Sequence, residues 1–378
     1  MTHFGFLSTY PPTRCGLATF TEALAEALTA GDSQQPTIVR VLDVRDGRLS
    51  APPVIGGIPT TADLISRDRV SMRTSVRALD RCDVAIIQHE YGIYGGPDGD
   101  EIIPLLRSLS TPAIVVLHTV LVAPTPHQRA VLDTVCRLAA IVVVMTDNAR
   151  GILRRSYNVK ESKVRVIPHG VTAPRAAPAI AHAGPKRILT WGLMTPGKGL
   201  EWGIRAIAQL RDTAAPIEYV IAGQTHPKVL AREGERYREA LQQLIIDLDL
   251  VDVVTLDDRY LDPTQLAALV EESDVVLLPY DSRDQATSGV LAEAVAAGVP
   301  VVATGFPHAV ELLGRGAGLI VEHEDPDSIA AAIRMILDAE GTADHMREAA
   351  LRDAQDSSWP AIAERYRAIV DRLVAVAA

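Results

Sequence analysis

Cysteine is scarce in this sequence, and its three cysteines form no recognisable pattern. Cys15, Cys82 and Cys136 are odd in number and far apart. Structural zinc sites use cysteine or histidine pairs a few residues apart, and a disulfide framework uses an even number of cysteines. The sequence therefore indicates neither, which is typical of a protein from a reducing compartment.

Long apolar runs are also absent. The longest, such as LAAIVVVM at 138–145, fall well short of the roughly 18 residues that a membrane-spanning helix needs. The N-terminal residues MTHFGFLSTYPP contain no cationic region followed by an apolar stretch, so they do not look like a secretory signal. We expect a cytoplasmic protein without stable membrane attachment.

Charge of one sign is not concentrated anywhere in the chain. The formal net charge is −10 and no long block of like charges occurs, so we expect no nucleic-acid partner. A protein of this charge that binds an anion must do so through a local group of donors.

With 378 residues, the chain exceeds the size at which a single core stops growing, roughly 250–300 residues, so two domains are expected.

Short apolar runs alternate with helical patterns along the chain. Continuous apolar strands followed by helices are typical of parallel sheets that helices cover on both faces. The pattern occupies residues 1–172, stops in the Pro/Ala-rich segment 173–186 and restarts over 187–357. The sequence therefore predicts an α/β chain with two doubly wound, Rossmann-like domains joined by a linker. We expect residues 358–378 to form an amphipathic helix that packs back toward the N-terminal domain, with an apolar stripe of Ile362, Tyr366, Ile369 and Leu373.

In open parallel sheets, ligands bind beyond the carboxyl ends of the strands. One such strand end is followed by a glycine-rich turn that leads to a helix, in LTWGLMTPGKGLEWGIRAI. The turn presents Lys198 near a helix N-terminus, where backbone amides and the helix dipole favour an anion. The spacing is not that of a phosphate-binding Walker A loop. An ordinary strand-to-helix turn with a solvated lysine is the alternative.

A second strand end carries DQATSGVLAEAVAAGVPVVAT at 284–304. Ser288 can cap the following helix, and Gly289 permits close approach of a phosphate to the backbone. Glu293 lies too far from Ser288 to close a capping box, so its carboxylate needs another partner in an apolar helix. Two vicinal sugar hydroxyls are suitable donors. The alternative is a glutamate on the exposed side of a surface helix.

Segments in the second half resemble the nucleotide-binding half of the GT-B-fold retaining glycosyltransferases of family 4. They are GLMTPGKGLEWGIRAI, VIAGQTHPKV, SDVVLLPY, QATSGVLAEAVAAGVPVVAT and GAGLIVEHEDPDSIAAAI. The first half is similar, in the same order, to that family's N-terminal glycine loop, acceptor-side loops, active-site histidine and hinge, in YPPTRCGLATFTEALAEAL, IIQHEYGIYGG, VVLHTV and IPHGV. The shared order covers nearly the whole chain. The resemblance implies a GT-B fold, in which two Rossmann-like domains face each other across a cleft.

The resemblance also implies roles for residues that bind a nucleoside-diphosphate sugar. Lys198 matches the lysine that neutralises the donor diphosphate in place of a metal ion. Ser288 and Gly289 match the loop whose amides hold the phosphates. Glu293 matches the second acid of the Glu-x7-Glu signature, which binds the ribose hydroxyls. No cofactor and no metal are expected.

Two further positions on the first domain follow from the same resemblance. Gly16 lies where the family's glycine loop faces the diphosphate. His118 matches the histidine beside the donor sugar and its reacting carbon, where an imidazole can hydrogen-bond a sugar hydroxyl or assist proton movement. A polar residue at a strand end is the structural alternative for His118.

The sequence departs from the family pattern at two positions. Gln285 replaces the first acid of the signature; it can still hydrogen-bond sugar hydroxyls but carries no negative charge near the anomeric carbon. A subset of the family carries this type of loop, so we place Gln285 with His118 in the catalytic group. Leu193 replaces a frequent arginine, and Arg14 on the facing loop is the candidate substitute in donor binding.

Other strand ends supply weaker candidates. His89, Glu90 and Tyr91 follow the apolar run DVAIIQ and are expected to bind the acceptor. His226 follows another strand of the second domain and is a candidate for phosphate binding, with a plain turn before Pro227 as the alternative.

The main hypothesis is transfer of a sugar from a nucleoside-diphosphate sugar to a hydroxyl acceptor, with retention. A sugar phosphorylase that uses free phosphate on a similar fold is the alternative, and a nucleotide requirement distinguishes them. A non-enzymatic nucleotide-sugar sensor is a third possibility, which the presence of His118, Lys198 and Glu293 disfavours. The sequence identifies neither the base and sugar of the donor, nor the acceptor, nor the oligomeric state.

Overall fold

The chain divides into two compact units, each built around one sheet. The computed structural model describes residues 2–42, 57–172, 184–211, 215–259 and 261–377. The first unit comprises Met1–Gly170 and Ser357–Ala378, and the second comprises Val171–Asp356. Most of the predicted linker 173–186 lies outside the described residues.

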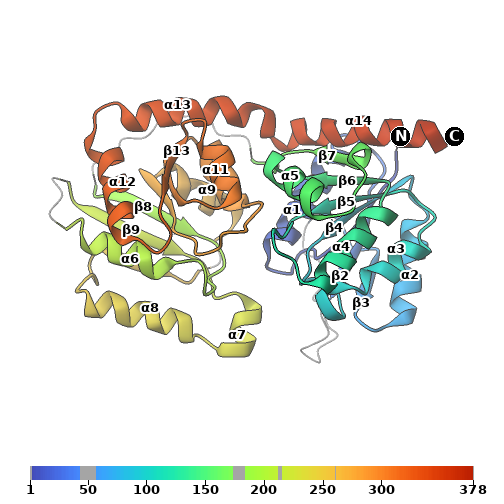
Figure 1. Cartoon of the computed structure of the whole chain (residues 1–378), viewed down its shortest axis with the longest axis horizontal. Coiled ribbons are helices and arrows are strands. Elements are labelled where there is room, and N and C mark those ends of the chain that lie inside the picture. The colour runs from blue at the N-terminus through green and yellow to red at the C-terminus, as the bar shows by residue number, and fades with distance from the viewer. Residues whose placement is uncertain (1, 43–56, 173–183, 212–214, 260, 378) are drawn as a thin grey trace. The chain divides into compact units, whose positions relative to one another are not determined.

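The sheet of the first unit has seven parallel strands in the order β3-β2-β1-β4-β5-β6-β7 (Figure 1). In the central register, Phe6 on β1 lies opposite Ile38 on β2 and Ile86 on β4. The strands are β1 (Phe4–Ser8), β2 (Thr37–Leu42), β3 (Ala62–Ile65), β4 (Val84–His89), β5 (Ala113–Leu117), β6 (Ile141–Val144) and β7 (Val164–Val166). The sequence pattern did not reveal β3, because its four residues ADLI contain an acid and lie at the sheet edge, where a strand needs less burial.

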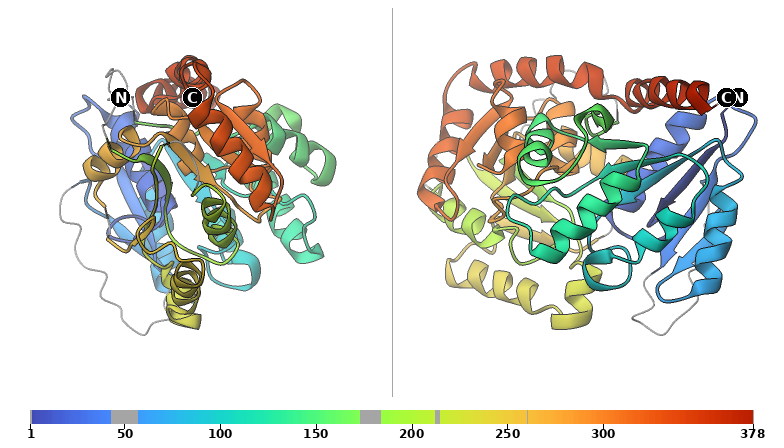
Figure 2. Two further views of the ribbon diagram at one scale, coloured as in Figure 1. Left: turned by 90° about the vertical axis from the view of Figure 1, so that its left-hand side faces the viewer. Right: turned by 45° about the vertical axis from the view of Figure 1, so that its right-hand side comes forward.

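Helices cover both faces of this sheet (Figure 1, Figure 2). They are α1 (Gly16–Thr29), α2 (Arg69–Leu79), α3 (Ile102–Ser108), α4 (Pro126–Leu138), α5 (Asp147–Ser156) and α14 (Trp359–Ala377). Helix α14 packs against α1, and Ile362 and Tyr366 of its apolar stripe are buried in the same core cluster as Phe6 and Leu24. The C-terminal helix is therefore part of the first unit.

The sheet of the second unit has six parallel strands in the order β10-β9-β8-β11-β12-β13. The strands are β8 (Lys186–Trp191), β9 (Ile217–Ala222), β10 (Val254–Asp257), β11 (Val275–Leu278), β12 (Val301–Thr304) and β13 (Gly318–Val321). The helices are α6 (Leu200–Ala208), α7 (Pro227–Glu233), α8 (Arg236–Asp247), α9 (Pro263–Glu271), α10 (Gly289–Ala296), α11 (Pro307–Leu313), α12 (Pro326–Asp338) and α13 (Thr342–Ala354).

Two apolar clusters occupy the two faces of the second sheet. Leu277 on β11 packs into the cluster that includes α6, α8 and α12, whereas its neighbours Val276 and Leu278 pack into the cluster with α10 and α11. Successive side chains of a strand point to opposite faces, so a strand that is covered on both faces must be apolar throughout. This explains the continuous apolar runs of the sequence and confirms the predicted pair of doubly wound α/β sheets.

No helix in the described part of the chain is both long enough and apolar enough to cross a membrane.

Candidate active site

The predicted donor residues of the second unit lie in loops that follow β8 and β11, which are neighbouring strands. Parallel strands end at the same edge of a sheet, so these loops lie side by side. Three contacts join them: Lys198 lies on the ring of Tyr280, Glu293 accepts a hydrogen bond from the Trp191 indole, and the Cβ position of Gly192 is 3.6 Å from Val290. The structure therefore brings the predicted lysine and acid to one edge of the second sheet.

The loop of Lys198 is docked on the segment that follows β11. The backbone amide of Asp281 donates to the carbonyl oxygen of Gly197 at 3.1 Å. Gly199 caps helix α6 in the left-handed conformation, with φ of 61°. A Cβ atom at Gly199 would lie 1.9 Å from the carbonyl oxygen of Pro279. Only glycine permits this close approach, which fixes the position of Lys198 relative to β11.

Lys198 is half-buried, and its Nζ lies 3.8 Å from the centroid of the Tyr280 ring. This distance is within the range of a cation–π interaction. The alternative of a freely solvated lysine in an ordinary turn is therefore wrong for this side chain. The ammonium group lies at the N-terminal end of α6, in a setting that suits an anion.

Helix α10 begins after Ser288, whose hydroxyl accepts a hydrogen bond from the Leu291 amide at 3.2 Å. The backbone amide of Ser288 donates to Nδ1 of His308 at 2.8 Å. The hydroxyl and the backbone amide of Ser288 thus have protein partners and shape the helix terminus. The amides of Gly289 and Val290 lie in the first turn, where an α-helix supplies no acceptor of its own. These are the amides of this loop best suited to phosphate.

Glu293 does not lie on an exposed helix face, so that alternative is wrong. Its side chain is half-buried, and burial raises the pKa of the carboxyl group to about 7, an effect that the hydrogen bond from Trp191 opposes. A carboxylate in this environment gains from additional donors, because desolvation disfavours its charged form. The site therefore offers a hydroxyl-bearing ligand a strong acceptor.

Gln285 and His226 occupy the borders of the same region. The side-chain amide of Gln285 donates to the Thr287 carbonyl oxygen at 3.2 Å, so the side chain is folded onto its own loop. His226 caps helix α7, where its Nδ1 accepts from the Lys228 amide at 3.1 Å. The turn before Pro227 thus has a structural function, while the bridge between Met194 and Thr225 keeps this turn beside the lysine loop.

In the first unit, His118 follows β5 and is paired with a buried glutamine. Its Nε2 lies 2.7 Å from Oε1 of Gln88, and its ring makes a T-shaped contact with Phe20 on α1, with 4.9 Å between centroids. Burial, with His169 and His89 nearby, lowers the pKa of His118 to about 3. A neutral imidazole that donates through Nε2 to Gln88 leaves Nδ1 as an acceptor.

The predicted acceptor residues follow β4. The Thr119 hydroxyl donates to Glu90, which also accepts from the Tyr91 amide at 3.0 Å. Tyr91 donates its hydroxyl to the Gln128 carbonyl oxygen at 3.4 Å, and burial raises the pKa of its phenol. His89 is fully buried, its ring makes a T-shaped contact with Tyr91, and burial lowers its pKa to about 4. His89 therefore lies beneath Glu90 and Tyr91, which are half-buried.

Gly16 is the first residue of α1, and both it and Arg14 are exposed. A Cβ atom at Gly16 would meet no protein atom within 4 Å. The protein's own packing therefore does not require glycine here, whereas close approach of a ligand would. Phe20, one turn later, contacts His118, so the glycine loop and His118 belong to one region of the first unit.

Three side chains of these regions were not among the sequence candidates: Tyr280, His308 and Gln88. Tyr280 and Gln88 lie at or next to strand ends, which is the one sequence signal they carry. His308 accepts a hydrogen bond from the amide of Ser288, which lies 20 residues away in the sequence. Only the folded chain reveals this pair.

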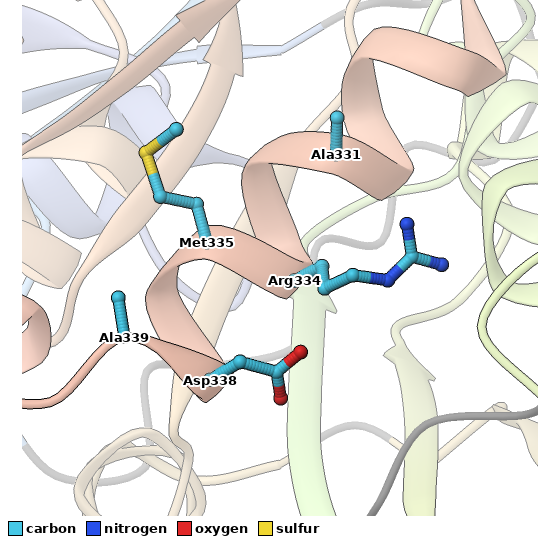
Figure 3. Close-up of a pocket in the computed structure, with 5 residues that line it drawn as sticks. All are labelled: Ala331, Arg334, Met335, Asp338 and Ala339. Atoms are coloured by element: carbon cyan, nitrogen blue, oxygen red, sulfur yellow. The ribbon is translucent and has the colours of Figure 1, made fainter.

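Other pockets and groups of side chains that could hold a metal ion are further features that could mark a functional site. A surface hollow on α12 is lined by Ala331, Arg334, Met335, Asp338 and Ala339, none of which is a predicted site residue (Figure 3). Within the described residues, no group of three or more histidine, cysteine, aspartate or glutamate side chains is arranged to hold a metal ion.

Two family models match the chain, one on each half. Residues 185–339 match the model described as Glycosyl transferases group 1, and residues 15–175 match the model described as Glycosyltransferase Family 4.

Curated relatives are similar over most of the chain. A protein of Kineococcus radiotolerans named D-inositol 3-phosphate glycosyltransferase is 31% identical over 301 residues, which cover 72% of this chain and 67% of the relative. A protein of the same name from Corynebacterium diphtheriae is 28% identical over 295 residues, which cover 70% and 66%. The match thus spans about two thirds of the length of these relatives.

Solved structures share the fold. Sucrose-phosphate synthase from Thermosynechococcus elongatus superposes with a TM-score of 0.76 at 20% identity, covering 99% of this chain and 100% of that one. HepE from Anabaena, solved in complex with UDP-glucose, superposes with a TM-score of 0.74 at 15% identity, covering 98% and 99%. At this level of identity the likeness concerns the fold alone.

The docking of the lysine loop predicts unequal effects of alanine at two glycines. Gly199 and Gly197 both have positive φ, 61° and 89°, which costs an L-residue about 1–2 kcal/mol. Only at Gly199 would the new Cβ meet protein, at Pro279, and such overpacking costs about 1–3 kcal/mol more. In urea unfolding we expect Gly199→Ala to lose about 2–5 kcal/mol and Gly197→Ala about 1–2 kcal/mol. Equal losses would contradict the docking.

The raised pKa of Glu293 predicts a pH dependence of stability. The folded protein holds the Glu293 proton up to a pKa of about 7, whereas an unfolded glutamate has a pKa of about 4.3. The folded state therefore binds more protons between these values, and the free energy of unfolding falls as pH rises through that window, by about 4 kcal/mol at most. Glu293→Gln should remove this part of the slope in urea unfolding at pH 5 and pH 8. An unchanged slope would show that Glu293 titrates normally.

Proposed function

The chain belongs to family 4 of the GT-B glycosyltransferases, and on this premise we propose that it uses a nucleoside-diphosphate sugar as donor. The sugar is transferred to a hydroxyl group of an acceptor, with retention at the anomeric carbon and without a metal ion. The observation that carries the proposal is the joining of Lys198, the α10 terminus and Glu293 at one edge of the second sheet, through the contacts with Tyr280 and Trp191.

The three groups suit the parts of a nucleoside diphosphate. The ammonium of Lys198 and the first amides of α10 suit the two phosphates, because both present positive charge or donors without an internal acceptor. Glu293 lies 4 residues after Gly289 in the sequence, about one turn along the helix. Its carboxylate can accept from the two ribose hydroxyls, the kind of paired donor that a buried acid needs.

The same groups act in the reaction. The bond between the anomeric carbon and the diphosphate oxygen breaks, and a bond from that carbon to the acceptor oxygen forms. The diphosphate leaves with increased negative charge, which Lys198 and the amides of Gly289 and Val290 stabilise. The acceptor hydroxyl loses its proton, which an oxygen of the departing phosphate can accept. Gln285 contributes a neutral amide at the sugar, after it leaves its contact with the Thr287 carbonyl.

The first unit supplies the acceptor side in this proposal. His118 is neutral at working pH because its pKa is lowered to about 3, so it acts through a hydrogen bond to the sugar rather than as a charged acid. Arg14 and Gly16 are assigned to diphosphate binding. Glu90 and Tyr91 contact the acceptor, and His89 supports Tyr91 from beneath. Because the curated relatives are named for D-inositol 3-phosphate, this compound is the first acceptor to test.

The experiment measures release of nucleoside diphosphate from UDP-, GDP- and ADP-sugars with candidate acceptors. We expect turnover with one base, and Lys198→Ala should lower kcat/KM by about 10²–10³-fold, the usual effect of removing one stabilising donor from a developing anion. Lys186→Ala is the matched control, because Lys186 begins β8 at the opposite edge of the sheet and pairs with Asp274 at 2.9 Å. Wild-type turnover of Lys198→Ala at limiting donor would refute the assignment. Turnover with a disaccharide and phosphate alone would instead indicate a phosphorylase.

A further inference from the structure

The ammonium group of Lys198 rests on an aromatic ring. Its Nζ lies 3.8 Å from the centroid of Tyr280. A lysine side chain has a flexible four-carbon stem, and holding it in one conformation costs conformational entropy. The face of the ring attracts the ammonium group and covers one side of it. An ammonium group has three N–H donors. Donors therefore remain for phosphate oxygens on the side away from the ring.

The ring of Tyr280 is itself held in place. Tyr280 is fully buried and stacks on Phe306, with centroids 5.2 Å apart and an angle of 20° between the rings. Its carbonyl oxygen accepts from Oγ1 of Thr304 at 2.6 Å and lies 2.8 Å from Nδ1 of His323. A ring that is stacked on Phe306 and anchored through its backbone can hold a flexible side chain in one position.

Within the described part of the chain, the hydroxyl of Tyr280 makes no hydrogen bond that would stabilise the fold. It is buried and has no hydrogen-bond partner among the described residues. A buried hydroxyl without a partner is unfavourable, and its replacement by an apolar group of the same shape costs little or stabilises. Tyr280 therefore contributes through the contacts of its ring, with Lys198 and Phe306.

We propose that Tyr280 positions Lys198 for the donor diphosphate through the face of its ring and without its hydroxyl. The inference rests on the proposed function, since it assigns Lys198 to the diphosphate. It is also consistent with Leu193, where the family often has an arginine: without that second cation, a single lysine, less rigid than an arginine fork, has to be ordered by its surroundings. Tyr280 is thus a positioning residue that acts through Lys198.

The test separates binding of the diphosphate from binding of the rest of the nucleotide. Calorimetry measures the affinity for UDP, GDP or ADP, whichever the wild type binds, and for the corresponding nucleoside. We expect Tyr280→Leu to weaken diphosphate binding by about 5–30-fold, the range of a partly to fully desolvated cation–π contact, and to leave nucleoside binding unchanged. Tyr280→Phe should retain the wild-type ratio of the two affinities, because it retains the ring.

A double-mutant cycle with Lys198→Ala shows whether Tyr280 acts through the lysine. In the Lys198→Ala background, Tyr280→Leu should have no further effect on diphosphate affinity. Tyr366→Leu is the matched control, because Tyr366 is an equally buried tyrosine in the first unit; it should lower stability without changing the ratio. If Tyr280→Leu does not fold, Tyr280→Met offers a longer, flexible side chain that adapts to the space without a ring.

Three results would overturn the proposal. Equal weakening of nucleoside and diphosphate by Tyr280→Leu would mean that the ring only supports the fold. A change in the ratio of diphosphate to nucleoside affinity in Tyr280→Phe would mean that the hydroxyl contributes to diphosphate binding. Additive effects in the cycle would mean that Tyr280 does not act through Lys198. Failure of the wild type to bind any nucleoside diphosphate would instead refute the proposed function, and the two failures are therefore distinguishable.

Discussion

The close approach of Gly199 to the carbonyl oxygen of Pro279 determines the geometry of the candidate donor site. It brings the loop after β8 against the segment after β11, with the amide of Asp281 bonded to Gly197. Lys198 then falls on the ring of Tyr280, and Trp191, at the end of β8, donates to Glu293. A side chain at position 199 would separate two strand ends whose combination gives the site its chemistry.

The buried carboxyl group of Glu293 lowers the stability of the folded protein when it is charged, and additional hydrogen-bond donors would offset this cost. Burial raises the pKa of Glu293 to about 7, so the folded protein near neutral pH holds a carboxyl group that is poorly solvated and has one donor, Trp191, among the described residues. Such a group destabilises the folded state when it is charged, and ligand hydroxyls can supply the missing hydrogen bonds. Perturbed acids of this kind are frequent at functional sites. If Glu293 binds the ribose as proposed, the affinity for the nucleotide near neutral pH is linked to the protonation of this one residue.

Much of the fold follows from the sequence because its strands are buried on both faces. Runs such as VVLL of β11 and IVVV of β6 are apolar at every position and stand out from their helices, whereas β3, a four-residue edge strand, does not. Lys198 and Glu293 were identifiable because each is a charge in a glycine-rich turn or an apolar helix at a strand end. Tyr280 and His308 were not, because their roles depend on which side chains the fold brings beside them. For His226, the Pro227 signal indicated the turn, and the structure shows the ring as its cap.

The central claim is that the second unit holds a nucleoside diphosphate with Glu293 on the ribose. The most direct test is calorimetric titration of the purified protein with UDP, GDP, ADP and orthophosphate, beside the Glu293→Ala variant. The account predicts that one nucleoside diphosphate binds tightly, that the variant loses this affinity and that orthophosphate binds weakly to both. Binding of orthophosphate without any nucleotide, or equal nucleotide affinity in wild type and variant, would contradict it.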